Sequence, residues 1–392
     1  MFVQLICKDR NEKEITELYQ VISAICHREE VQIEESGDKV VVSVCPQGKI
    51  VIGEKDNELD LYASTRHAGA GFHAFVVDIF KDIQEELPGN YELIDDLHFA
   101  EDEDFDHLQA LFEDELDYLR GLLLKEEEMR LRNYMYEETY YLPIEKENRI
   151  CTSIGDMDQE EFRQISMEDL INSFYVWPNW DKDARYYKNA ALTVLAKEGM
   201  GIYSKMNEMA EKKANEICDY IELAYQKDNQ ISLPVKEYTY LTNLLNRENK
   251  LTKDTVQMEQ EVIQYRLKEV YHLFDIAKVV ALGSAERCYD PVSQSINLMA
   301  PHKEDDEWEW LIQASLQPRI MTRLEEVKKQ KNQSYDSKTI CTMDWEEDGY
   351  YVIEGILNQD TNTLYFHDVV ANKEQIPYLK TCMKQSGFQN QE

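Results

Sequence analysis

The segment KVVVSVCPQGKIVIGEKDNELDLYA (residues 39–63) decides the first part of the fold. It contains three short runs rich in β-branched and other apolar residues, at Lys39–Cys45, Ile50–Ile52 and Leu59–Ala63. Pro46-Gln47-Gly48 supplies turn chemistry between the first two runs. These features predict three successive β-strands.

The elements around this segment extend the pattern. A strand is predicted at Phe2–Cys7, a helix at Glu12–Cys26 from its apolar spacing, and a short strand at Val31–Ile33. A second helix is predicted at Phe72–Leu87, where Pro88-Gly89 ends it. The order strand, helix, four strands, helix predicts a small antiparallel or mixed sheet with helices on one face.

The rest of the chain is predicted to be mainly helical, with a return to β structure near the end. Tyr350–Leu357 and Thr363–Val370 alternate as a hairpin does, and Glu374–Met383 follows as a helix. We therefore expect an α+β protein with an acidic α/β domain at 1–140, a mainly helical domain at 141–335, and a C-terminal β-hairpin and helix at 336–392. The predicted helices of the middle region are Met167–Phe174, Lys182–Lys197, Ile202–Gln226, Val235–Asn246, Thr255–Val280 and Asp305–Lys329.

The charge of the chain restricts its partners. The 392 residues include 77 acidic and 42 basic ones, a net charge of −35, and 36 of the acidic residues fall within the first 150. Such a surface repels nucleic-acid phosphates and anionic lipids and attracts basic proteins. No apolar run is long enough to span a membrane, no secretory signal is visible, and the eight cysteines form no C-x-x-C pair. We expect a cytoplasmic protein that binds neither nucleic acid nor membranes.

Two segments are candidates for docking a basic partner protein. Nine acidic residues and no basic one lie between Glu101 and Asp117, and a dense aromatic cluster lies at Phe174–Asp181. An interaction protein (an adaptor, inhibitor or immunity-type neutraliser) would use such features. A solvated helix face, a packed joint between helices and a structural subunit of a larger assembly remain alternative interpretations. The candidate docking residues are Glu101, Asp102, Glu103, Asp104, Asp106, Trp177 and Trp180.

A second hypothesis is an enzyme or ligand sensor that binds a small anion, such as a phosphate or carboxylate. The string Ser64–His73 joins a predicted strand to a predicted helix, and its glycines allow a close backbone approach. A tight connection with glycine at positive φ is the alternative. The candidate anion-binding residues are Thr65, Arg66, His67, Gly69, Gly71 and His73. No catalytic signature is intact, so we assign no catalytic residue, and the sequence predicts no metal site and no cofactor.

Overall fold

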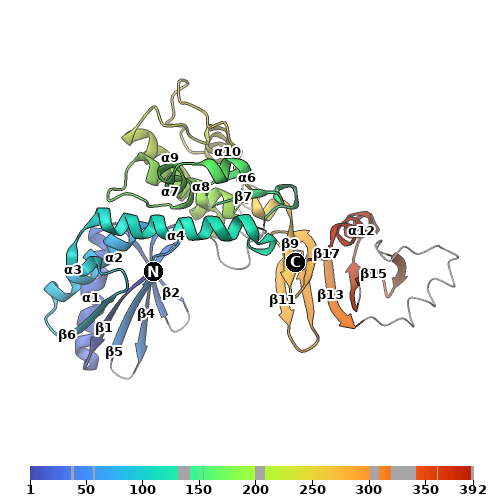
Figure 1. Cartoon of the computed structure of the whole chain (residues 1–392), viewed down its shortest axis with the longest axis horizontal. Helices are drawn as coiled ribbons and strands as arrows, with labels where there is room; N and C mark the ends of the chain where they lie inside the picture. The colour runs from blue at the N-terminus through green and yellow to red at the C-terminus, as the bar shows by residue number, and fades with distance from the viewer. Residues whose placement is uncertain are drawn as a thin grey trace. The chain divides into compact units, whose positions relative to one another are not determined.

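The computed structural model describes residues 1–36, 39–55, 58–130, 142–152, 154–198, 208–300, 309–318, 341–359 and 361–389. It combines helices with antiparallel sheets, so the predicted α+β class is confirmed (Figure 1). The described residues form two compact units. The first contains those of 1–125 and 148–263, and the second those of 126–130, 142–147 and 264–389.

A six-stranded antiparallel sheet forms the N-terminal part of the first unit. Its strand order is β2-β3-β4-β5-β1-β6, so the first strand of the chain is inserted between the fifth and the sixth. Each strand predicted in the first 63 residues is present, and the pairing is antiparallel throughout. The bounds are β1 Phe2–Lys8, β2 Gln32–Ser36, β3 Lys39–Cys45, β4 Gly48–Lys55, β5 Glu58–Ser64 and β6 Asn90–Asp95.

Helices α1 (Glu12–Arg28) and α2 (Ala70–Glu86) cover one face of this sheet. Along β1, Val3, Leu5 and Cys7 are buried while the residues between them are partly exposed. This alternation is the period of two that a half-covered sheet requires. The helices that the sequence predicts on one face are therefore confirmed.

The remaining helices of the first unit pack beside the sheet domain. The leucine-rich stripe of α4 is buried from Leu108 to Leu123, and α4 contacts both α2 and α7 (Figure 1). A short hairpin of β7 (Arg149–Cys151) and β8 (Asp156–Asp158) precedes the helices α6 to α10. The helix bounds are α3 Phe99–Asp102, α4 Phe105–Lys125, α6 Gln159–Gln164, α7 Met167–Phe174, α8 Ala184–Glu198, α9 Glu208–Lys227 and α10 Val235–Leu245.

An ion cluster around the buried carboxylate of Glu222 joins α9 to α10 and the segment after it. The side chain of Glu222 is 5% exposed and accepts hydrogen bonds from Tyr238 Oη at 3.0 Å, Arg247 Nη2 at 2.7 Å and Lys250 Nζ at 2.6 Å. Burial raises the pKa of Glu222, but the hydrogen bonds from Lys250 and Arg247 outweigh it and lower the pKa below the ordinary value. The carboxylate is therefore ionised and fully paired.

The second unit is built from two antiparallel sheets and helix α12 (Ile376–Gln385). One sheet has the order β17-β10-β9, and the other has the order β11-β12-β13-β16-β15-β14. The strands are β9 Glu269–Phe274, β10 Ala277–Leu282, β11 Glu286–Asp290, β12 Ser295–Met299, β13 Trp310–Pro318, β14 Cys341–Glu347, β15 Tyr350–Gln359, β16 Asn362–Val370 and β17 Gly387–Phe388. The short elements are α5 Glu127–Arg130, η1 Ile144–Lys146, η3 Tyr265–Leu267 and η4 Lys373–Gln375.

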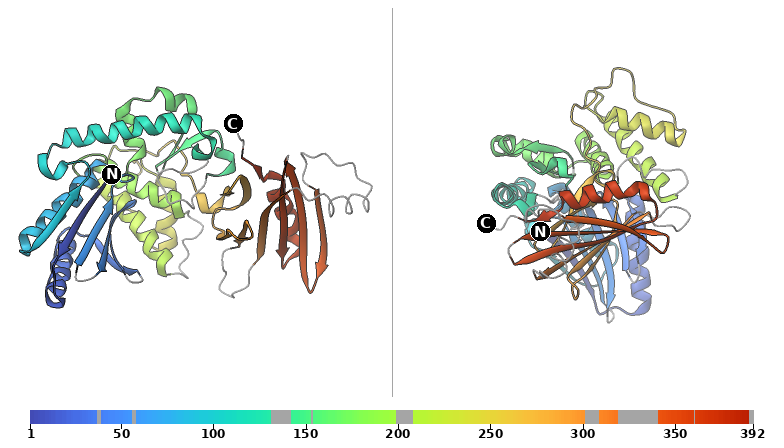
Figure 2. Two further views of the ribbon diagram at one scale, coloured as in Figure 1. Left: turned by 60° about the horizontal axis from the view of Figure 1, so that its bottom comes forward. Right: turned by 90° about the vertical axis from the view of Figure 1, so that its right-hand side faces the viewer.

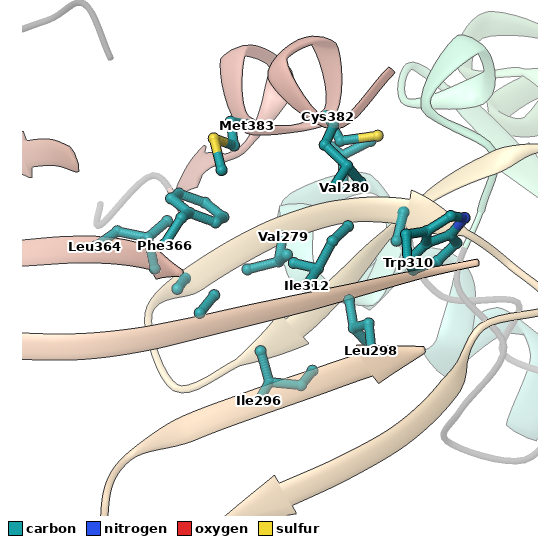
Figure 3. Packing of buried hydrophobic residues seen from close by; sticks show 14 of the residues in the cluster. Val279, Val280, Ile296, Leu298, Trp310, Ile312, Leu364, Phe366, Cys382 and Met383 are labelled. Atoms are coloured by element: carbon teal, nitrogen blue, oxygen red, sulfur yellow. The ribbon is translucent and has the colours of Figure 1, made fainter. Parts of the chain in front are cut away.

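The core of the second unit lies between these sheets and α12. Helix α12 lies along one face of the C-terminal strands and contacts β10, β15 and β16 (Figure 2). Figure 3 shows Val279 of β10 beside Ile312 of β13, and Val280 of β10 beside Cys382 of α12. The predicted C-terminal hairpin and helix are present as β15, β16 and α12, and the hairpin belongs to the six-stranded sheet.

Two predicted helices are wrong. Residues 269–280 of the expected helix Thr255–Val280 belong to the hairpin β9–β10, whose two-residue turn has Asp275 at φ +48°. Residues 310–318 within the expected helix Asp305–Lys329 form β13, and its burial alternates strictly. The rest of that range, at 305–308 and 319–329, and 202–207 of another predicted helix lie outside the described residues.

The predicted division at 141 and 336 remains a prediction, because compact units of a structure are not in themselves independently folding domains. The described residues of 148–263, which the sequence assigns to a separate helical domain, belong to the same compact unit as the N-terminal sheet.

Candidate functional site

The two glycines of the Ser64–His73 connection admit another segment of the same chain. Gly69 precedes α2 at φ +114°, and the N–H of Gly71 donates to the carbonyl of Trp177 at 3.0 Å. A Cβ atom at Gly69 would lie 2.5 Å from the Trp177 carbonyl oxygen, and one at Gly71 would lie 2.1 Å from that of Asn179. Both positions therefore require glycine because residues 177–179 approach so closely.

Arg66 and His67 are the two candidates at 64–69 whose side chains can carry a positive charge, and both interact within the protein. Arg66 donates from Nε to Glu115 of α4 at 2.7 Å, so its guanidinium is paired with a carboxylate. Burial, assisted by the charge of Arg66, lowers the pKa of His67 to about 4, so that His67 is neutral at pH 7. The ion pair with Glu115 accounts for Arg66 without a ligand, and anion binding at the connection stays a prediction.

Thr65 and His73 belong to a buried hydrogen-bonded chain that ends at Asp95. Thr65 Oγ1 lies 2.9 Å from His73 Nδ1, and His73 Nε2 lies 3.0 Å from Asp95 Oδ1. Burial raises the pKa of Asp95, but hydrogen bonds from His73 and from the backbone N–H of Ala100 outweigh it and lower the pKa. The order hydroxyl, imidazole, carboxylate resembles that of a nucleophile with its base.

This chain is closed to substrates. Thr65 and His73 are both 0% exposed, and the rings of Phe99 and Phe112 stand edge-on against His73. Asp95 also accepts the backbone N–H groups of Leu97 and Ala100, which fixes the start of α3. We therefore interpret the chain as a support that ties β5, α2 and β6 to α3.

The predicted docking residues lie partly together on the first unit. Trp180 is 49% exposed and rests on Phe99 and Phe105, with ring centroids 6.0 Å and 5.1 Å apart. Phe99 and Phe105 belong to α3 and α4, the two helices that carry the acidic segment. We call the exposed group of Glu101, Asp102, Asp104, Asp106 and Trp180 the acidic–aromatic surface.

Trp177 and Glu103 are the two predicted docking residues that do not belong to this surface. Trp177 is only 3% exposed, packs against Phe75 and Tyr186, and lies under the ammonium of Lys182 at 4.8 Å. Its role is therefore packing, which removes it from any docking surface. Glu103 is exposed but pairs with Lys81 of α2.

The helical part of the first unit contains a cavity of about 1080 Å³ that was not predicted from the sequence. The β7–β8 hairpin, helices α6 to α8 and the segment between α9 and α10 line it. Arg185 and Lys188 of α8 stand on its wall, three residues apart, and Lys188 Nζ donates to Ser232 Oγ at 3.0 Å. The signal available in the sequence was this spacing of two cations at the start of a predicted helix.

Within the described ranges, no three His, Cys, Asp or Glu side chains are grouped so that they could hold a metal ion. The same ranges contain no helix with the length and apolarity needed to cross a bilayer. Comparison of the chain with models of protein families, with curated proteins and with solved structures found no match. Function therefore has to be argued from the sites themselves.

Proposed function

We propose that this protein is an interaction protein that docks a basic partner protein through the acidic–aromatic surface. The observation that carries the proposal is Trp180, a large exposed ring that rests on Phe99 and Phe105, two rings of the segment that also carries the four exposed carboxylates. Tryptophan is among the residues that contribute most to binding at protein interfaces.

The chemistry of this surface selects a cationic partner. A lysine or arginine side chain gains from contact with the face of an indole ring, and carboxylates around the ring add charge-assisted hydrogen bonds. No Lys or Arg occurs between Glu101 and Asp117, and Lys81, which lies beside this segment, is paired with Glu103. A net charge of −35 also accelerates the approach of a basic protein and slows that of a nucleic acid.

We place this interaction in the cytoplasm. The seven cysteines whose side chains are described are free thiols, and six of them are buried. Free thiols persist in a reducing compartment, which supports an intracellular site of action.

The test is a pull-down from native lysate with four forms of the full chain. The wild type is compared with the variant Trp180→Ala and with the double variant Glu101→Lys/Asp106→Lys. A matched control, Asp254→Lys/Glu259→Lys, makes the same change of net charge at exposed positions outside the surface. We expect the wild type and the control to retain one stoichiometric basic protein that high salt releases, and both surface variants to lose it.

Retention of the same partner by all four proteins would show that another surface binds it. Absence of any protein on the wild type, or release of the partner by the control variant alone, would refute docking at this surface. Circular dichroism of each variant establishes that it is folded before its binding is compared.

A further inference from the structure

The cavity of about 1080 Å³ is large enough for a small organic molecule, since ligand pockets span roughly 300 to 1,000 Å³. Its wall combines apolar side chains, including Leu192, Ile231 and Met258, with polar groups on α8 and on the segment after α9. It lies wholly within the first unit and shares no residue with the acidic–aromatic surface. A ligand here would be independent of the proposed docking.

Two cations of α8 face this cavity without a carboxylate partner in the described part of the chain. Lys188 has one hydrogen-bond partner there, the hydroxyl of Ser232, and Arg185 has none. Burial, with the like charge of Arg185 added, lowers the pKa of Lys188 below that of an ordinary lysine. Such an arrangement is unusual in a chain whose acidic residues outnumber its basic ones by 35.

Five carboxylates line the same wall, those of Asp156, Glu161, Asp169, Asp183 and Asp228, but within the described residues none of them forms an ion pair with Arg185 or Lys188. Asp156 binds Arg149, and Asp183 accepts the backbone N–H of Tyr186 at 2.8 Å and Asn179 Nδ2 at 3.1 Å. Asp183 therefore caps the start of α8 instead of neutralising Lys188. The charge of Lys188 and Arg185 remains available to a ligand.

We propose that the cavity binds a small organic anion, whose phosphate or carboxylate group is held by Arg185, Lys188 and the Ser232 hydroxyl. The Ser232 oxygen accepts from Lys188 and can donate its own proton to the anion. The body of the ligand is apolar, because Leu192, Ile231 and Met258 form the neighbouring wall. An anion in this position opposes the unfavourable charge of two adjacent cations.

Amine labelling with mass spectrometry tests the proposal on the full chain at constant ionic strength. The probes are phenyl phosphate and benzoate, which separate the two anionic groups, with benzyl alcohol as the neutral control. We expect at least one anionic probe to slow labelling of Lys188 several-fold, because a bound anion favours the unreactive ammonium. The exposed Lys253 serves as the internal control and should label at an unchanged rate.

Calorimetry then measures the affinity of the protecting probe. The variant Arg185→Gln should raise its dissociation constant about tenfold, the effect of one lost charge-assisted hydrogen bond, and Lys253→Gln should not change it. Arg185 is exposed, so its replacement does not endanger folding. Three results would overturn the proposal: no protection by either anion, equal protection by benzyl alcohol, or unchanged affinity in Arg185→Gln.

Discussion

The buried His272 makes the stability of the second unit depend on pH. It lies on β9, is 2% exposed, and donates from Nε2 to the Leu282 carbonyl at 3.1 Å. Burial lowers its pKa to about 4; the hydrogen bond to Leu282 acts against this, and the charge of Arg287 adds to it. The folded protein therefore keeps His272 neutral where an unfolded histidine, with a pKa of about 6.5, takes up a proton.

The direction of the pH dependence of stability follows from which state, folded or unfolded, binds the proton. Between pH 6.5 and pH 4 the unfolded state binds a proton that the folded state does not, so stability is lost as the pH falls through this range. A pKa near 4 against about 6.5 corresponds to a loss of about 2 kcal/mol at pH 5 relative to pH 7.5. We expect this loss in the β9–β10 hairpin, which contains His272.

Hydrogen exchange of the full chain, read by mass spectrometry for the β9–β10 amides, measures the effect. The wild type and the variant His272→Gln are compared at pH 7.5 and pH 5, with the intrinsic exchange rates corrected for pH. Glutamine retains an N–H donor for Leu282 but does not titrate. Other titrating groups of this unit contribute to both proteins, so the difference between them isolates His272. Equal loss of protection in both proteins on acidification would refute the reasoning.

Three further predictions concern single side chains and are measured by urea unfolding of the full chain. Burial raises the pKa of Asp368 well above its ordinary value, so the stability of the wild type should fall as the pH rises above about 4. The variant Asp368→Asn should remove this pH dependence. The same pH dependence of stability in the variant and the wild type would argue against the role of Asp368. Glu222→Gln removes the buried charge that pairs with Arg247 and the half-exposed Lys250 and should cost about 1 to 3 kcal/mol, whereas a loss below about 0.5 kcal/mol would mean that the cluster contributes little. Gly71→Ala should cost about 1 to 3 kcal/mol of stability, because its Cβ would force residues 177–179 away. The control Gly53→Ala has open space around its Cβ and should cost nothing. Equal losses of stability in the two variants would contradict the close approach at Gly71.

The N-terminal sheet could be predicted from the sequence because its local signals agree with its tertiary environment. Residues 39–45 form a strand with the predicted bounds, and the predicted Pro46-Gln47-Gly48 turn connects it to β4. One face of the sheet is covered and the other is not, so hydrophobicity alternates in a way that a single sequence can reveal. The strand order could not be predicted, because the insertion of β1 between β5 and β6 depends on contacts distant in sequence.

The second unit could not be predicted to the same extent, for a reason visible in β9 and β10. Five of the six residues in each of these strands are buried, so the hairpin is an almost continuous apolar run. Periodicity cannot separate such a run from a buried helix, although the β-branched Val270, Val279 and Val280 favour a strand. The cavity was missed for a related reason, since a sequence does not reveal which charges lack partners.

The Ser64–His73 connection and the acidic–aromatic surface are linked by direct contacts. Gly69 and Gly71 admit the Trp177–Asn179 segment, which leads directly to Trp180, and Gln109 of α4 donates to the Pro178 carbonyl at 3.3 Å. From the other side, His73 holds Asp95, which in turn fixes the N–H of Ala100 beside Phe99. The connection predicted to bind an anion thus supports the aromatic base on which Trp180 rests. Changes such as Gly71→Ala should therefore weaken partner docking indirectly, through displacement of Trp180, while the exposed carboxylates of the surface stay in place.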